Sequence, residues 1–531
     1  MSVFNSKSRT RNFLRTSMVG SVCNFASIVM GFVYQTVFLH LLSVNYLGIS
    51  GLFANILRLL SLAELGIGSS ITYRFYKPIA ENDVEKVGQL VNYNKQVYRV
   101  IALVIFSLGM LLMPFLKYLI KGAEEVPADV NLQFVYFLHV VQTVSTYTYA
   151  YKQAILHADQ KKYITEFITA SLHLLRYVVQ IAVLLLTRNY TLMMMMSILI
   201  TVGGNILATF LFTRGYKEVF RVKSRLSRQE RKTIWGDTGA IMLHRIGATV
   251  ITSTDNLVLT RFVGLTAGGL YSNYAQIIHS LTMTLQHLMG GGYNSSYGNA
   301  LTVLSPEQNF NVFSRLQFLN LSVVGLCTSC LYLLVNPFVT LWVGEALLLD
   351  RLTVMALSIQ FYLECCRLIV KAYNEANGNF VYDKLRPVIS SAINLGVSIV
   401  LAIKLGVAGV FFGTAVSNLC TFFWREPLLL FRHAFKRSTA PYWKQYLRHT
   451  AYTFFFTFAL SYLDGYMHFA VSWIDWIWKA LIIGTLYMMG WLLLFHKTRE
   501  FHFFLALFKK HAKQFFEKMR KKFKKEKRGV Q

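Results

Sequence analysis

The chain carries fourteen apolar segments, each about as long as a lipid bilayer is thick. A helix needs roughly 20 apolar residues to cross the hydrocarbon core, and short polar breaks separate such segments along most of the sequence. The segments lie near 13–41, 46–73, 98–120, 131–155, 165–187, 191–213, 235–261, 268–296, 316–341, 353–373, 387–404, 407–431, 447–464 and 474–496. We therefore predict an all-α polytopic membrane protein with about 14 transmembrane helices.

The composition agrees with this class. Only 15% of the residues are charged, against about 25% in a soluble domain, and the mean hydropathy is +0.42. The 41 Phe and 29 Tyr with only 8 Pro suit long helices with interfacial aromatic anchors better than barrel strands. The six cysteines lie in apolar segments, so we expect neither disulfides nor a metal site, and no cofactor. No cleavage site follows the basic N-terminus, so the first helix is expected to stay.

The distribution of Lys and Arg predicts the orientation in the membrane. Cytoplasmic loops carry an excess of both residues. Four precede or begin the first helix, eight lie in 214–232, and the alternate loop 121–129 has one Lys against three acids. Both termini are therefore expected in the cytoplasm, with the chain in the cell membrane. The net charge of +29 is explained by these loops and calls for no nucleic acid.

The C-terminal segment 497–531 is strongly basic, with thirteen Lys or Arg against three Glu. Its apolar residues recur every three to four positions, as in an amphipathic helix: Phe504, Phe508, Ala512, Phe515, Met519 and Phe523. We expect this helix to lie on the anionic inner leaflet. A solvated, disordered tail is the alternative.

An internal repeat is indicated when the sequence is shifted by 221 residues. The shift places 45–62 on 266–283, matching Gly48 to Gly269, Ala54 to Ala275 and Ile56 to Ile277. Because 221 residues span six helices, an even number, the copies run in the same direction, as parallel repeats do. Chance similarity between apolar helices is the alternative. The expected parts are a cytoplasmic N-terminus 1–12, an N-lobe 13–213, a basic linker 214–234, a C-lobe 235–431, a cytoplasmic loop 432–446, two further helices in 447–496, and the tail 497–531.

Four arginines lie deep within the predicted spans: Arg58, Arg176, Arg245 and Arg367. An arginine at a helix centre costs roughly 2.5–3.5 kcal/mol on insertion scales, so it normally faces a partner or a watery cavity. The acids at similar depth are fewer, chiefly Glu64, Asp255 and Glu364. An excess of guanidinium groups suits an anionic ligand, and Arg binds phosphate in a bidentate fork. We therefore predict a cationic cavity built for phosphate.

The alternative for each arginine is a structural ion pair, which Glu364 and Arg367 can form within one helical turn. The carboxylates Glu64, Asp255 and Glu364 are candidates for carrying a coupling ion or for gating. Glu64 lies about 120° around the helix from Arg58, and Gly66 and Gly68 just beyond it can loosen the helix there. No residue is assigned a catalytic role.

Two stretches also carry a family resemblance. The segment "GLFANILRLLSLAELGIGSSITYRFYKPIAENDVEKV" (51–87) resembles a signature of Wzx-like polysaccharide transporters, in the Gram-positive branch of the multidrug/oligosaccharidyl-lipid/polysaccharide (MOP) exporter superfamily. The segment "STDNLVLTRFVG" (253–264) is similar to the helix 7 motif of that family. The resemblance implies a flippase that moves undecaprenyl-diphosphate-linked oligosaccharide units to the outer leaflet for capsule or cell-wall assembly. It also implies that cavity arginines, Arg58 above all, engage the diphosphate, and that the last two helices form a groove for the lipid tail.

Two other functions remain as hypotheses. A multidrug antiporter of the same fold would favour carboxylates over arginines, since its substrates are cationic. A lipid-dependent glycosyltransferase would need acidic residues on an outer loop, where they are sparse. We therefore expect a transporter and no enzyme, working by alternating access of the two lobes. Without a phosphate-binding loop for ATP, the energy would come from the membrane potential or from an H⁺ or Na⁺ gradient.

Overall fold

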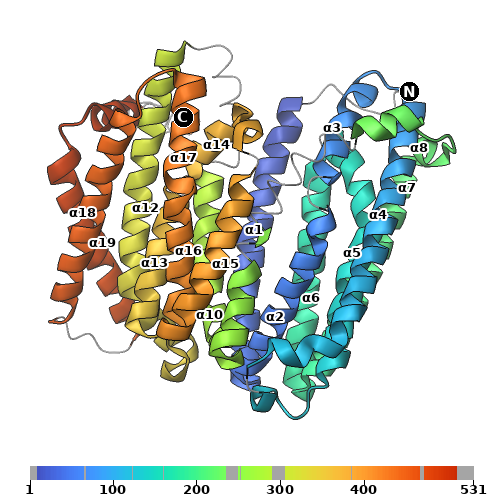
Figure 1. Cartoon of the computed structure of the whole chain (residues 1–531), viewed down its shortest axis with the longest axis horizontal. Coiled ribbons are helices and arrows are strands. Elements are labelled where there is room, and N and C mark those ends of the chain that lie inside the picture. Colours follow the sequence, from blue (N-terminus) through green and yellow to red (C-terminus); the bar gives the residue numbers. More distant parts are fainter. Residues whose placement is uncertain are drawn as a thin grey trace, which may run out of the picture. The chain divides into compact units, whose positions relative to one another are not determined.

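The computed structural model describes residues 9–64, 67–121, 123–159, 161–234, 249–250, 253–289, 305–383, 385–466 and 472–510 (Figure 1). Within these ranges the regular structure is entirely helical, and all fourteen predicted spans overlap helices. Nine helices in the described part of the chain are long and apolar enough to cross a membrane. The prediction of an all-α polytopic membrane protein is confirmed.

The first half of the chain forms seven long or medium helices and one short helix. These are α1 (Arg9–Leu41), α2 (Val44–Leu60), α3 (Ile67–Ala80), α4 (Val84–Leu112), α5 (Leu132–Ala158), α6 (Lys162–Thr187), α7 (Tyr190–Gly215) and α8 (Lys217–Arg221). The second half continues with α10 (Leu265–Met289), α12 (Pro306–Val343), α13 (Arg351–Cys365), α14 (Leu368–Ala376), α15 (Arg386–Leu405), α16 (Val407–Cys420), α17 (Phe422–Leu430), α18 (Ala440–Asp464) and α19 (Trp473–Phe495).

Three of the predicted continuous spans are interrupted in the structure. Span 46–73 becomes α2, a 3-10 turn at Ser61–Glu64, and α3, as the nearby Gly66 and Gly68 suggested. Span 353–373 divides into α13 and α14 at Arg367, and span 407–431 divides into α16 and α17 at Thr421. The last two breaks contain no Gly or Pro at the interrupted turn, and side-chain interactions described below stabilise the break at Arg367.

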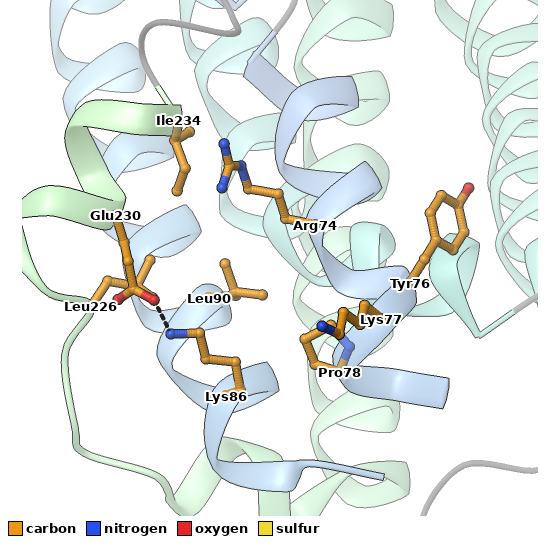
Figure 2. A pocket seen from close by; sticks show the side chains of 9 residues that line it. All are labelled: Arg74, Tyr76, Lys77, Pro78, Lys86, Leu90, Leu226, Glu230 and Ile234. Atoms are coloured by element: carbon orange, nitrogen blue, oxygen red, sulfur yellow. Dashed lines mark hydrogen bonds and ion pairs between the residues drawn. The ribbon is translucent and has the colours of Figure 1, made fainter. Parts of the chain in front are cut away.

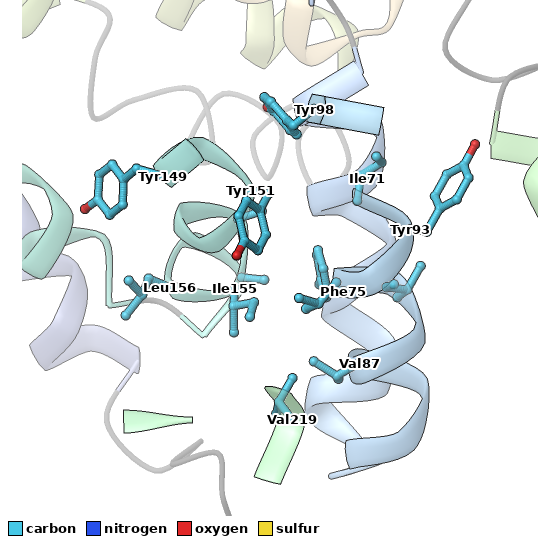
Figure 3. Close-up of a cluster of buried hydrophobic side chains, with 14 of the residues drawn as sticks. Ile71, Phe75, Val87, Tyr93, Tyr98, Tyr149, Tyr151, Ile155, Leu156 and Val219 are labelled. Carbon is cyan, nitrogen blue, oxygen red and sulfur yellow. The ribbon is translucent and has the colours of Figure 1, made fainter. Parts of the chain in front are cut away.

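The helices group into two compact units. The first comprises Met1–Thr284, Trp342–Leu363 and Gly378–Arg425, and the second comprises Leu285–Leu341, Glu364–Asn377 and Glu426–Gln531. In the first unit α4 packs against α5, and α5 packs against α7. Their facing side chains build a buried cluster in which Phe75 of α3 and Val87 of α4 meet Ile155 of α5 (Figure 3).

Within the first unit, α2 and α10 touch through a reciprocal contact between positions 221 residues apart. A Cβ on Gly48 would lie 2.4 Å from the carbonyl oxygen of Leu265, and a Cβ on Gly269 would lie 2.2 Å from that of Val44. A shift of 221 maps Val44 onto Leu265 and Gly48 onto Gly269. Such mutual contact of equivalent residues is the mark of a two-fold axis. It is the relation expected of parallel repeats, while the boundaries of the two lobes stay a prediction.

The second unit is built around α12, α18 and α19. Tyr487 of α19 packs against Tyr452 of α18, and its hydroxyl bonds with Thr453 at 3.1 Å. Trp491 donates its indole N–H to Ser322 of α12 at 3.1 Å. Residues 499–510 continue as helix, and the ring of Phe503 lies under the Arg315 guanidinium at 3.8 Å. Of the predicted tail helix, 511–531 lies outside the described residues.

Candidate functional site

Arg58 lies in the last turn of α2, where the helix gives way to the 3-10 turn. Its side chain is exposed and forms no ion pair with any residue in the described part of the chain. Glu64 instead accepts a hydrogen bond from the Tyr98 hydroxyl at 3.3 Å and lies against the hydroxyl of Tyr147. The structural Arg58–Glu64 pair, the alternative for Arg58, is therefore not formed in this structure.

A second polar side chain, the imidazole of His279, lies near Arg58 on the repeat-related helix α10. The ring of His279 is exposed and within electrostatic range of the Arg58 guanidinium. His279 is also the residue onto which the 221-residue shift maps Arg58. Sequence reasoning missed His279, although this shift already contained the signal. An exposed guanidinium and an exposed imidazole, both able to donate hydrogen bonds, thus occupy equivalent positions on the helices that meet at the Gly48–Gly269 contact.

Arg176 lies on α6, which packs against α1 within the first unit. Its guanidinium lies within electrostatic range of Tyr34 of α1 and of His173, one turn away. The Nε atom of Arg176 is buried, as is Oε1 of Gln180 one turn further on, and neither has a hydrogen-bond partner among the described residues. The guanidinium therefore keeps donor capacity for a ligand. Arg245, the third predicted cavity arginine, lies outside the described residues.

Arg367 has a different environment, because two carboxylates bind it within the second unit. Its Nε and Nη2 atoms donate to the two oxygens of Glu426 at 3.0 and 2.9 Å, and its Nη1 atom donates to Glu364 at 2.8 Å. The side chains of Arg367 and Glu426 are only 10% and 7% exposed. This geometry matches the ion-pair alternative for Arg367. The phosphate role of Arg367 and the coupling role of Glu364 stay predictions.

The break between α13 and α14 leaves backbone carbonyl groups without helical partners, and α12 supplies donors for them. The Gln317 amide donates to the carbonyl of Cys366 at 3.1 Å, and the Asn320 amide donates to that of Cys365 at 3.1 Å. Both amide side chains are fully buried. In lipid an unsatisfied backbone group costs several kcal/mol, so a broken helix persists only where neighbours satisfy it.

Asp255 forms a separate buried site in the first unit. Its carboxylate accepts a hydrogen bond from Thr414 of α16 at 3.0 Å, and Asn394 of α15 donates to the same hydroxyl at 2.8 Å. Asp255 is 6% exposed and has no cationic partner among the described residues. A carboxylate buried in this way requires a proton or a bound cation to offset its desolvation. The oxygens of Asp255, Asn394 and Thr414 are ligands that a hard cation prefers.

Close packing of α15 on α16 brings Asn394 and Thr414 together. A Cβ on Gly409 would lie 2.1 Å from the carbonyl oxygen of Leu401, and one on Gly413 would lie 2.3 Å from the hydroxyl of Ser398. Small residues at these positions allow two helix backbones to approach in a membrane. Among the described His, Cys, Asp and Glu side chains, no group of three could hold a metal ion.

Sequence reasoning therefore located residues that belong to three separate places. Arg58 and Glu64 flank the break after α2, Asp255 lies in the buried α15–α16 site, and Arg367 with Glu364 forms an ion-pair cluster in the second unit. Besides His279, it missed Glu426, Asn394 and Thr414, each of which lies far along the chain from the residue it contacts. Their polar side chains within apolar spans were the available signal.

Comparison with known proteins identifies the fold. No protein-family profile matches the chain, and no curated protein does. Among solved structures, the lipid II flippase MurJ in an inward closed conformation is similar with a TM-score of 0.65 and 14% identity, over 90% of this chain and 99% of that chain. An inward-facing multidrug resistance MATE family transporter of the MOP superfamily is similar with a TM-score of 0.57 and 12% identity, over 78% of this chain and 99% of that chain.

A third similar structure is a MOP superfamily transporter from Pyrococcus furiosus, described as having a binding pocket of reverse polarity that suggests a different function. Its TM-score is 0.53 at 12% identity, over 81% of this chain and 97% of that chain. At such identities the likeness establishes the fold. The chain thus has the architecture of MurJ and of the MATE transporters, and it is a multi-pass membrane protein.

Proposed function

We propose that the protein is a flippase of the MOP superfamily, of the Wzx-like Gram-positive branch. Its proposed substrate is an oligosaccharide repeat unit linked to undecaprenyl diphosphate, moved from the inner to the outer leaflet for capsule or cell-wall polysaccharide assembly. The observation that carries the proposal is the exposed guanidinium of Arg58 on α2, with the imidazole of His279 at the repeat-related position on α10. Arg58 has no carboxylate to neutralise it within the described residues.

The chemistry of this pair favours an anionic ligand. Placing a cationic side chain inside a membrane protein costs free energy unless the side chain faces water or an anion. A diphosphate has oxygens that can accept hydrogen bonds from both sides of a two-fold axis. Arg176, whose buried Nε atom has no hydrogen-bond partner within the described part of the chain, adds a third donor. Arg245 completes the set that we propose for the diphosphate, whereas the contacts of Arg367 favour a structural role.

The similar structures also bear on the choice between two transporter functions. MurJ, described as a lipid II flippase, is similar over 90% of this chain, whereas the MATE transporters are similar over about 80%. The larger fraction of this chain that is similar to MurJ supports a flippase in which the last two helices, α18 and α19, accommodate a lipid tail. A multidrug antiporter is the second candidate, because the fold accommodates it, and the unneutralised Arg58 counts against cationic drugs.

The proposed mechanism is alternating access about the two-fold axis. The polar head crosses between the lobes while the lipid tail stays in the bilayer. A diphosphate of charge about −2 that leaves a negative interior gains roughly 4–5 kcal/mol at 100 mV, taking about 2.3 kcal/mol per charge. The buried Asp255 site is proposed to carry H⁺ or Na⁺ during the return step, and Glu64 is proposed to gate the cavity.

The test replaces Arg58 and His279 one at a time in cells that depend on the protein for surface polysaccharide. Arg58→Ala and His279→Ala should each stop surface polysaccharide and let lipid-linked repeat units accumulate, at normal protein abundance. Arg58→Lys should restore only part of the transport, because an ammonium cannot form the planar fork of a guanidinium. Arg228→Ala, on the exposed linker, is the matched control. Full polysaccharide in Arg58→Ala cells, or efflux of a lipophilic cation that needs Asp255, would instead favour the antiporter.

A further inference from the structure

A loop of the predicted N-lobe is hydrogen-bonded to the start of α10 in the predicted C-lobe. The loop joins α4 to α5 and contains Lys121 and Glu125. Because residues 121–129 carry one Lys against three acids, we expect this loop on the outer side of the membrane. The π-helical turn η5 (Leu259–Val263) and Gly264 directly precede α10. Contacts between the loop and this corner therefore connect the two predicted lobes at the expected outer end.

Glu125 supplies a hydrogen-bond acceptor for the first turn of α10. Its Oε2 atom accepts a hydrogen bond from the backbone N–H of Thr266 at 2.9 Å. The start of a helix has N–H groups without helical partners and a partial positive charge, and a carboxylate there satisfies both. A Cβ on Gly264, whose φ is +147°, would lie 3.1 Å from Oε1 of Glu125. A glycine at this position therefore allows the carboxylate to approach the corner closely.

Lys121 binds the other side of the same corner, at the end of η5. Its backbone N–H donates to the carbonyl of Thr260 at 3.1 Å, and its Nζ atom donates to the carbonyl of Phe262 at 2.9 Å. The last carbonyl groups of a helix lack helical partners and carry a partial negative charge, which an ammonium group offsets. Lys121 and Glu125, which we call the latch, thus supply partners for backbone groups on both sides of the corner.

The latch carboxylate belongs to one repeat only. A shift of 221 maps Thr266 onto Asn45 in the first turn of α2, but it maps Glu125 onto Ala346. Among the described residues, Ser43 at the start of α2 makes no side-chain cap hydrogen bond. Asn45 instead donates to the backbone carbonyl of Glu125 at 2.8 Å, and its Oδ1 atom lies 2.9 Å from the hydroxyl of Thr266. The loop of the N-lobe therefore holds the first turns of α2 and α10 together.

The packing of α2 and α10 shows which end of the two helices is closed. They are in close contact where Gly48 and Gly269 each lie against a carbonyl group of the other helix. Ser272, one turn after Gly269, is half-buried. Near the other end of this interface, Arg58 and His279 are exposed. The helices are thus closed at the end that carries the latch, where we expect the outer side of the membrane.

Another charged contact in the first unit differs from the latch, because it lies within the N-lobe and its linker. Figure 2 shows the ion pair between Lys86 of α4 and Glu230 of the linker. Asn92 of α4 also donates to the linker, at the carbonyl of Val222 at 2.7 Å. All four residues precede 235, where the predicted C-lobe begins. Breaking this ion pair therefore removes a carboxylate contact without touching the corner between η5 and α10.

We propose that the latch of Lys121 and Glu125 holds the outer side of the protein closed and releases when the protein opens outward. The proposal rests on the alternating access proposed above. On release, the N–H of Thr266 and the carbonyls of Thr260 and Phe262 meet water at the expected outer surface. Hydrogen bonds to water then replace those to the latch, so the net change in free energy is small. A contact that opens and closes in each transport cycle needs this property.

The experiment measures how fast a membrane-impermeant maleimide labels Ser272→Cys from outside intact cells. The chain without this substitution gives the background from the six native cysteines. When the open state is rare, the labelling rate is proportional to its population. Glu125→Ala should raise the rate about tenfold, the effect of one charge-assisted hydrogen bond. Glu125→Gln, which keeps an acceptor for Thr266, and Lys121→Ala, which keeps its backbone bond, should each raise it about threefold.

Two further variants are the controls for loss of a carboxylate. Glu124→Ala changes the neighbouring residue of the same loop, whose exposed side chain makes no hydrogen bond or ion pair within the described residues. Glu230→Gln breaks the ion pair with Lys86 in Figure 2. Each should change the labelling rate by less than about twofold.

The proposal would be overturned by unchanged labelling in Glu125→Ala and Lys121→Ala, or by an equal increase in Glu124→Ala. If Glu125 only caps α10, Glu125→Ala will lower the abundance of the protein without changing the labelling rate per molecule. Lys121→Ala, at an exposed side chain, decides the matter if Glu125→Ala fails to fold. The labelling needs no substrate. Loss of polysaccharide in Arg58→Ala cells with unchanged labelling in the latch variants would therefore refute the latch and leave the flippase proposal standing.

Discussion

Removing Arg367 separates its two candidate roles, because a structural ion pair and a phosphate ligand respond differently to the loss of both partners. Arg367→Met leaves Glu426 buried without its bidentate partner, while Glu364, 45% exposed, can be hydrated. Breaking a buried pair from one side costs about 3–5 kcal/mol. We therefore expect the free energy of unfolding of the second unit to fall by about that amount, and the protein's abundance in the membrane to fall with it.

The companion variants sharpen this prediction. Glu426→Gln keeps an acceptor for the guanidinium and leaves Glu364 in place, so it should cost about 1–3 kcal/mol. Arg367→Met with Glu426→Met removes both buried charges, and such replacements return stability to within about 1–2 kcal/mol of the original or better. Lys371→Met, an exposed position one turn further along α14, is the control for loss of charge and should be nearly neutral.

The assays are denaturant unfolding of the purified protein, abundance in the membrane, and surface polysaccharide. On the structural account, the Arg367–Glu426 double variant recovers both stability and transport. On the phosphate account, it recovers stability but not transport. The reasoning from contacts would be refuted if Arg367→Met alone were as stable and abundant as the original protein and yet inactive.

Three further predictions address the two-fold contact, the coupling site and the orientation. Gly48→Ala should push α2 and α10 apart by about 1 Å, which is the overlap of its Cβ with the Leu265 carbonyl. It should therefore reduce disulfide formation between cysteines placed at Asn45 and Thr266, whose side chains are hydrogen-bonded at 2.9 Å. Gly203→Ala, which meets nothing within 4 Å, is the control, and unchanged cross-linking in Gly48→Ala would contradict the close contact. Asp255→Asn should fold normally, because the amide keeps an acceptor for Thr414, but should remove the dependence of transport on an H⁺ or Na⁺ gradient; a gradient dependence that survives would exclude Asp255 as the carrier. A cysteine at Glu124 should be labelled from outside intact cells and one at Arg225 should not, since positive loops stay inside; the reverse pattern would invert the topology.

The apolar segments predicted the positions of the helices well, because a helix in lipid must bury its backbone whatever it packs against. The break after α2 was also foreseeable, since Gly66 and Gly68 lie beside it. The break at Arg367 was not, because no Gly or Pro lies beside it. Its cause lies some 45 residues earlier, in the amides of Gln317 and Asn320, and helical periodicity carries no information about contacts at such distances.

The candidate site was predictable to a similar degree. Deep charges mark functional or paired positions, which is why sequence reasoning singled out Arg58, Asp255 and Arg367. Which of them is paired depends on tertiary contacts: Glu426 reaches Arg367 across 59 residues of chain, and Thr414 reaches Asp255 across 159. The spacing of side chains on a helix identified only one partner for Arg367, namely Glu364, three residues away. His279 could have been found, because the repeat maps it onto Arg58.

The amides of α12 that bind the carbonyls of Cys365 and Cys366 also set a limit on how this part of the protein can move. If α13 or α14 moved along α12 by one residue, about 1.5 Å of helix rise, each amide would face a different carbonyl group. Both helices would then expose unpaired carbonyls to a medium that contains no replacement donor. Sliding of this segment along α12 would therefore cost several kcal/mol for each carbonyl group that loses its donor.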